Sequence, residues 1–126
     1  MSERNRIRSF KDLEIWKRGI DIVETIYRIT QPFSEKELYG LTNQLRRAAV
    51  SVPSNIAEGF SRASKKEYKH FLYVSLGSCS ELITHMIISS RLKYIDNKLA
   101  EDIIDELEQI SKMTMTLIKK INAAYQ

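Results

Sequence analysis

Hydrophobic residues recur every three or four positions along most of the chain, which is the period of an amphipathic α-helix. The first such run covers residues 10–30, and Ser9 followed by Asp12 forms the Ser-x-x-Asp signal of a helix start. Two apolar stripes, about 120° apart, share this segment. They consist of Leu13, Trp16, Ile20, Val23 and Tyr27, and of Ile15, Ile22, Ile26 and Ile29. Because one helix of a lone bundle needs a single stripe, two stripes predict a central helix or a subunit contact, and we expect self-association.

A second helical segment begins at the capping box of residues 34–37, after the stop signal Gln31-Pro32-Phe33. Its apolar positions keep one phase through Pro53, at Leu38, Leu41, Leu45, Ala48, Val52 and Ile56. This continuity predicts a helix that passes through Pro53 with a kink and ends at Gly59, because proline removes one backbone hydrogen bond and crowds the preceding turn. The alternative is a helix that ends before Pro53 and a short new helix that starts at Ser54.

Two further segments complete the pattern. The start signal at residues 64–67 precedes a third helix that runs to about residue 94, and a turn at Asp96-Asn97 precedes a fourth at about 98–124. Their inward positions are Tyr68, Phe71, Leu72, Ser75, Cys79, Leu82 and Met86, then Ile103, Leu107, Ile110, Leu117 and Ile121. Short loops favour antiparallel neighbours, so we predict an all-α protein, an up-down-up-down four-helix bundle with a kinked second helix. Residues 10–126 form this domain and residues 1–9 a flexible basic tail.

Composition narrows the class of protein. The chain has 126 residues, 43% of them hydrophobic, and a formal net charge of +4. Its single cysteine, Cys79, excludes an intrachain disulfide, and the N-terminus has no apolar stretch of the kind found in signal peptides. No apolar run approaches the roughly 18 residues needed to cross a bilayer. We therefore expect a cytoplasmic protein without membrane association.

Residues that carry chemistry are sparse. The two histidines, His70 and His85, lie on one predicted helix about 22 Å apart at 1.5 Å per residue, too far to share a metal ion within a subunit. The chain has no glycine-rich phosphate loop and no nucleophile–base motif, and Cys79 falls on an inner stripe. We expect no enzymatic activity, no metal and no cofactor.

Polar side chains follow one face of the second helix, opposite its apolar stripe. They are Gln44, Arg47, Ser51, Asn55 and Glu58. A solvated outer face is the simplest interpretation, yet such a face usually carries more Lys and Glu. Small hydrogen-bonding side chains also suit close approach by another chain, so a subunit contact is the alternative, and a ligand groove is a third.

Basic residues gather in two further places besides the N-terminal tail. These are the pair Arg46-Arg47 and the cluster Arg62, Lys65, Lys66 and Lys69. Lys65 and Lys66 lie in the first turn of the third helix, where exposed amide donors and lysines together make an anion site. Phe60 and Tyr68 flank the cluster and could stack on bases, although Tyr68 also fits the core. A simpler interpretation is that cations such as Arg62 stabilise the C-terminal end of the second helix.

Four sequence blocks, in order, resemble one family. They read DLEIW at 12–16, LYGLTNQLRRAA at 38–49, SVPSNIAEG at 51–59 and GSCSEL at 77–82. They are similar to the bacterial four-helix-bundle family that is also called the 23S rRNA intervening-sequence protein family, and the resemblance covers about residues 10–120. It implies a four-helix bundle that assembles into a homo-pentamer without catalytic residues. It also implies kinship with the accessory protein of diversity-generating retroelements, a basic pentamer that binds nucleic acid and a reverse transcriptase.

The sequence thus predicts a ring-like homo-oligomer that binds RNA or DNA electrostatically through Arg46, Arg47, Arg62, Lys65, Lys66 and Lys69. In an antiparallel hairpin that turns near Arg62, Glu81 of the third helix comes level with Arg47, and we expect the two to pair. The alternative function is a protein–protein adaptor or structural oligomer whose charge only maintains solubility.

Overall fold

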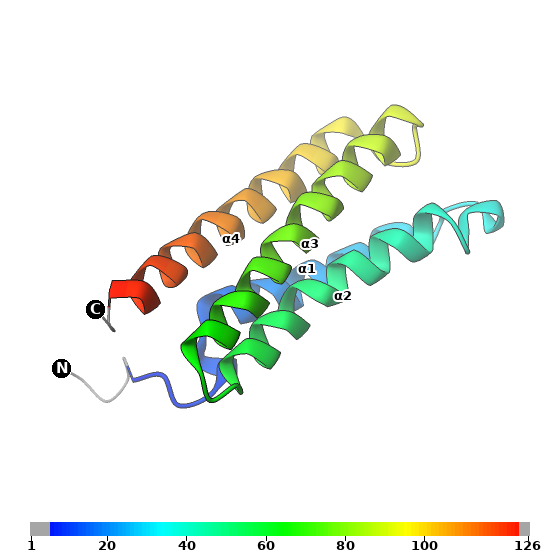
Figure 1. The fold of residues 1–126 in the computed structure, drawn as a ribbon. Helices are drawn as coiled ribbons and strands as arrows, with labels where there is room; N and C mark the ends of the chain where they lie inside the picture. Colours follow the sequence, from blue (N-terminus) through cyan, green and yellow to red (C-terminus); the bar gives the residue numbers. More distant parts are fainter. Residues whose placement is uncertain (1–5, 124–126) are drawn as a thin grey trace.

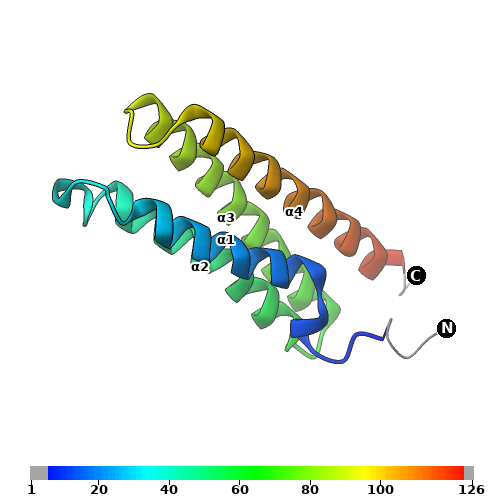
Figure 2. The same cartoon turned by 180° about the vertical axis from the view of Figure 1, so that it is seen from behind.

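The computed structural model describes residues 6–123 and contains four long helices. These are α1 (Glu14–Thr30), α2 (Leu41–Phe60), α3 (Lys65–Arg91) and α4 (Asn97–Ala123). The helices run side by side and alternate in direction, so that each packs against its neighbour in sequence (Figure 1). The same arrangement seen from behind shows α1 lying over α2 (Figure 2). No strand occurs within residues 6–123. The predicted antiparallel all-α bundle is confirmed.

The core takes one stripe of α1 and leaves the other near the surface. Ile15, Ile22 and Ile26 are buried, whereas Tyr27 is 44% exposed. Trp16, Ile20 and Val23 are half-buried along the same edge as Tyr27. One of the two predicted stripes therefore faces the core, and the other is covered only in part by this single chain.

Both of the first two helices start later than the sequence pattern predicted. The capping box of Ser9 and Asp12 forms, but it starts the 3-10 helix η2 (Phe10–Asp12), and α1 begins at Glu14. Ser34 likewise caps only the 3-10 helix η3 (Glu35–Glu37). The chain then leaves helical geometry before α2 begins at Leu41.

The late start of α2 corrects one predicted core residue. Leu38 lies in the connection before Gly40 and is 48% exposed, so its assignment to the core was wrong. The reason is local, because the Gly40 backbone is not helical (φ −108°, ψ −110°) and the helical phase is broken there. The carboxylate of Glu37 accepts a hydrogen bond from the Leu41 amide at 3.3 Å and so satisfies the first turn of α2.

Pro53 lies inside α2, which continues unbroken to Phe60. The continuous helix is confirmed and the alternative of two shorter helices is wrong; the kink stays a prediction. The proline ring is buried against α1 at Gly19, where an added Cβ would come within 3.2 Å of the Pro53 Cβ. A helix-interior proline costs about 3 kcal/mol or more, and packing of the ring against a residue without a side chain offsets part of that cost.

α3 passes between α2 and α4 and ends in a tight C-terminal turn (Figure 1). The Tyr94 amide donates to the Ser89 carbonyl at 2.9 Å, and Lys93 adopts a left-handed conformation with φ of 69°. α3 is also the one described helix that is long and apolar enough to cross a bilayer, by length and composition alone. The sequence expectation overlooked it. Its inner side packs in the bundle, and a core helix passes the same test.

Candidate nucleic-acid interface

The two ends of the bundle differ in charge. At one end, α1 and α3 begin while α2 and α4 end (Figure 1). Segments 6–18, 58–70 and 112–123, which build this end, hold twelve Lys and Arg against four Asp and Glu. The other described segments, 19–57 and 71–111, hold seven against eleven. The basic end therefore has a formal charge of +8 and the rest of the described chain −4.

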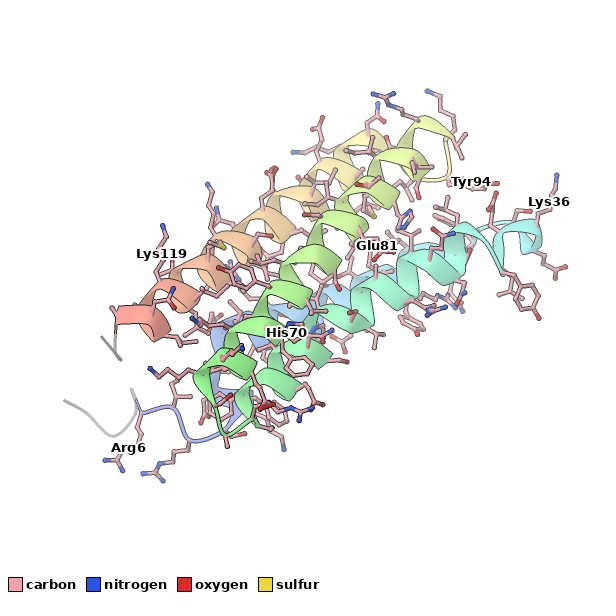
Figure 3. The ribbon with its side chains drawn as sticks, viewed as in Figure 1. Arg6, Lys36, His70, Glu81, Tyr94 and Lys119 are labelled. Atoms are coloured by element: carbon pink, nitrogen blue, oxygen red, sulfur yellow. The ribbon has the colours of Figure 1, made fainter. Side chains whose placement is uncertain are left out.

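α3 and α4 both supply lysines to the basic end. The Lys69 ammonium donates to the Asn122 side-chain carbonyl at 2.6 Å, which ties the start of α3 to the end of α4. The exposed Lys119 and Lys120 of α4 therefore lie at the same end as Lys65 and Lys66. Figure 3 labels Lys119 at this end, together with Arg6 from the N-terminal segment. Sequence reasoning missed the two α4 lysines, although an antiparallel fourth helix must return its last turn to the start of the third.

The first turn of α3 has the features of an anion site. Ser64 caps the helix by accepting a hydrogen bond from the Glu67 amide at 3.1 Å. The neighbouring amides and the helix dipole favour negative charge. Burial lowers the pKa of the Lys65 ammonium below its ordinary value, and the nearby charge of Lys69 lowers it further. A phosphate would offset this repulsion between lysines.

Arg62 belongs to the basic end but is already engaged. Its guanidinium pairs with the Glu58 carboxylate at 2.7 Å and with the Glu67 carboxylate at 3.7 Å. It also lies over the Phe71 ring, 5.0 Å from the centroid. Arg62 thus links the end of α2 to the start of α3. Its contact with Glu58 lies within the chain, and the subunit contact considered for Glu58 stays a prediction.

Arg46 lies far from this end and holds the end of α1. Arg46 precedes Arg62 by sixteen positions, and the fourteen of these that lie within α2 span about 21 Å at 1.5 Å per residue. The Arg46 side chain donates to the Thr30 hydroxyl at 2.9 Å and to the Tyr27 carbonyl at 3.4 Å, and it lies over the Tyr27 ring. These contacts satisfy groups in the last turn of α1. The predicted set of six basic residues is therefore divided between two regions of the surface.

Arg47 contributes to a polar pocket of about 360 Å³ between α2 and α3. The lining residues are Gln44, Arg47, Ala48, Ser51 and Glu81. Four predicted residues from two helices thus meet at one place. Within residues 6–123, however, Arg47 and Glu81 form no ion pair, and the contact of Glu81 is with His85 at 3.6 Å. Glu81 is labelled in Figure 3 beside α2.

Hydrogen bonds between hydroxyl and amide groups join α2 to α3 next to this pocket, beginning at Ser51 of its lining. Ser78 donates to the Ser51 hydroxyl at 2.7 Å, and the Asn55 amide donates to the same hydroxyl at 2.8 Å. The buried Ser75 hydroxyl donates to the Val52 carbonyl at 2.9 Å. The polar face of α2 is therefore in part a hydrogen-bonded contact between helices, which explains its small side chains.

Aromatic residues at the basic end are mostly packed against one another. The rings of Phe60 and Tyr68 meet edge to face, with centroids 6.0 Å apart. Tyr73, two turns into α3, is 52% exposed.

The structure offers no candidate metal site within residues 6–123, because no three His, Cys, Asp or Glu side chains there lie close enough together to hold an ion.

Comparison with known proteins identifies the family. The family model described as 23S rRNA-intervening sequence protein matches residues 11–116. The chain belongs to this family. No curated protein sequence matches the chain significantly. The predicted family resemblance is thus confirmed for the 23S rRNA-intervening sequence proteins.

A solved structure agrees with the fold of this family member. It is a crystal structure of a protein with unknown function from the S23 ribosomal protein family of Bacteroides thetaiotaomicron VPI-5482. The two structures superpose with a TM-score of 0.75 at 20% identity, over 83% of this chain and 98% of the other. At this level of identity the likeness concerns the fold alone.

Proposed function

We propose that this 23S rRNA-intervening sequence protein is a non-enzymatic, homo-oligomeric scaffold that binds RNA or DNA at its basic end. One observation carries the proposal, namely the +8 formal charge that segments 6–18, 58–70 and 112–123 gather at a single end. Phosphate contacts of this kind are largely indifferent to base sequence. The proposal places the protein in the cytoplasm, where such ligands are available.

Self-association would multiply a weak contact. In a ring of copies the same basic end recurs, so phosphate contacts on one nucleic acid add up. The family resemblance favours a pentamer. The partly exposed α1 stripe of Trp16, Ile20, Val23 and Tyr27 supports a subunit contact. Val50 of α2, which is 39% exposed, supports it too. Beside it lies a pocket of about 600 Å³ that is lined by Tyr27, Asn43, Arg46, Arg47, Val50, Ser51, Ser54 and Asn55.

Fluorescence anisotropy across a salt series tests binding to structured RNA, single-stranded DNA and duplex DNA. The logarithm of the association constant should fall linearly with the logarithm of salt concentration, with a slope of about 0.9 per phosphate contact for duplex DNA. Replacement of Lys65, Lys66 and Lys69 by Ala should weaken binding to all three and reduce the slope. The matched control replaces Lys36, Lys93 and Lys98, which removes equal charge from the opposite end. Absence of binding at low salt would refute the proposal.

Native mass spectrometry tests the subunit contact. Val50→Glu should dissociate the oligomer, because it places a charge in the proposed contact on α2. Val74→Glu is the matched control, since Val74 of α3 is 38% exposed and Val50 is 39% exposed. A wild-type monomer at micromolar concentration would refute self-association.

A second candidate function is a protein–protein adaptor, for example for a reverse transcriptase. The outer face of α3 favours it, because Val74, Ile87 and Ile88 are each about 40% exposed. From residue 70 to residue 90 this helix carries no Lys or Arg, whereas a solvated face normally does. Loss of partner binding in Ile88→Glu with unchanged nucleic-acid affinity would favour this function.

A further inference from the structure

We infer that Tyr73 stacks on unpaired bases, so that single-stranded nucleic acid is the preferred ligand of the basic end. This inference rests on the proposed function, since stacking acts only on a ligand that the lysines have attracted. It goes further by naming the state of the nucleic acid and the residue that distinguishes it. Lysine–phosphate contacts alone make no such distinction.

The position of Tyr73 on α3 joins it to the lysines. Lys66, Lys69 and Tyr73 are spaced by three and four residues, so they follow one stripe of the helix within about 10 Å along its axis. His70, which is labelled in Figure 3 at the same end, lies between them on the exposed side. A strand whose phosphates contact the two lysines would therefore pass beside the Tyr73 ring.

The other rings at the basic end are occupied by contacts within the protein. Phe10 and Trp16 meet edge to face at 5.4 Å, as Phe60 and Tyr68 do at 6.0 Å. Phe71 lies under Arg62 and beside His70. Tyr73 has no ring or cation partner among residues 6–123, and half of its surface is open. Among the described residues, Tyr73 is therefore the ring beside the basic end that a base can reach.

The surface beyond Tyr73 leaves room for a base. Gly77 follows one turn later, and an added Cβ there would meet no atom within 4 Å. Ser80 continues the exposed side of the helix with a small neutral side chain. On this side of the helix the next turn therefore presents the small residues Gly77 and Ser80 beside the partly buried Leu76, and it carries no carboxylate. In a duplex the base faces are already stacked, so the ring gains nothing from them.

The experiment compares three probes of equal length by anisotropy: an oligothymidylate, a duplex, and an abasic single strand that keeps phosphates without bases. Tyr73→Leu should weaken binding to the oligothymidylate about fivefold to a hundredfold, the range found for loss of one base–aromatic stack. Binding to the duplex and to the abasic strand should stay within about twofold. Tyr73→Phe keeps the ring and should bind like the wild type.

Tyr39→Leu is the matched control, because Tyr39 is 89% exposed but precedes α2 at the opposite end of the bundle. It should change no affinity. An unchanged oligothymidylate affinity in Tyr73→Leu would overturn the inference while the lysine variants still test the proposed function. Equal weakening for the abasic strand would overturn it too, since that strand has no base to stack. Failure of the wild type to bind any probe would refute the proposed function itself.

Discussion

The contact between α2 and α3 is close enough to give two glycines opposite responses to alanine. Gly59 of α2 is buried, and an added Cβ there would lie 2.9 Å from the Phe71 Cβ and 3.0 Å from the Tyr68 carbonyl oxygen. Neither group is the free end of a flexible side chain, so α2 and α3 must separate. A Cβ added at Gly77 of α3 would meet no atom within 4 Å. The two substitutions therefore differ in packing, while both add the same methyl group to a helix.

The expected sizes follow from packing and helix propensity. Overpacking costs about 1–3 kcal/mol, and alanine in a helix recovers up to about 1 kcal/mol, so Gly59→Ala should lower the free energy of unfolding by about 1–2 kcal/mol. Gly77→Ala should raise it by about 0.5–1 kcal/mol. For a domain of this length the unfolding entropy corresponds to about 4 °C per kcal/mol. The melting temperature should thus fall by about 4–8 °C in Gly59→Ala and rise by about 2–4 °C in Gly77→Ala.

Urea denaturation followed by circular dichroism at 222 nm measures both changes, and equal m-values would show that the same surface unfolds. The melting temperatures should be compared at one protein concentration, because self-association makes them depend on it. A Gly59→Ala protein as stable as the wild type would refute the reasoning. A destabilised Gly77→Ala protein would instead indicate that another molecule covers this face of α3.

Three further predictions concern helix ends and pH. Lys93→Gly should raise the free energy of unfolding by about 1 kcal/mol in urea titrations, because glycine adopts the left-handed conformation without strain. Arg46→Lys should lower it by about 1–2 kcal/mol, since lysine cannot reproduce the forked contacts with Thr30, and the retained charge should leave nucleic-acid affinity unchanged. The hydrogen bond to Glu37 raises the pKa of Tyr94 above its ordinary 10.0. The stabilisation that this bond gives the folded protein is therefore present below pH 10 and is lost as the pH rises through the pKa of Tyr94 in the folded state. Melts from pH 8 to pH 11 should therefore show a smaller alkaline loss for Tyr94→Phe.

Periodicity was sufficient to predict the bundle, because helices of 17 to 27 residues each repeat their apolar pattern several times. It failed at the start of α2, where one non-helical glycine shifts the phase and a capping signal serves a single 3-10 turn. Leu38 fits the apolar stripe by spacing, yet it lies before that break. The Glu37 carboxylate accepts a hydrogen bond from the first amide of α2 and another from the Tyr94 hydroxyl of a distant segment, and the spacing of apolar residues reveals neither contact.

The candidate site was predictable only in part, because charge alone does not reveal which basic residues already have partners. Arg46 and Arg62 have the same formal charge as Lys66, but both are held by contacts with neighbouring helices or turns. Their partners become visible only in three dimensions. Conversely, Lys119 lies 50 residues beyond Lys69 in sequence and joins it through the antiparallel path of α4.

The described chain starts and ends at the same end of the bundle, which is the basic one (Figure 1). A purification tag on either terminus is therefore tethered beside the surface whose ligand is sought. A polyhistidine tag would add cations there at mildly acidic pH, and a large fusion partner would obstruct access. The connection at residues 38–40 lies at the opposite end, where Tyr39 is 89% exposed, and is the better place for an inserted epitope or fluorophore.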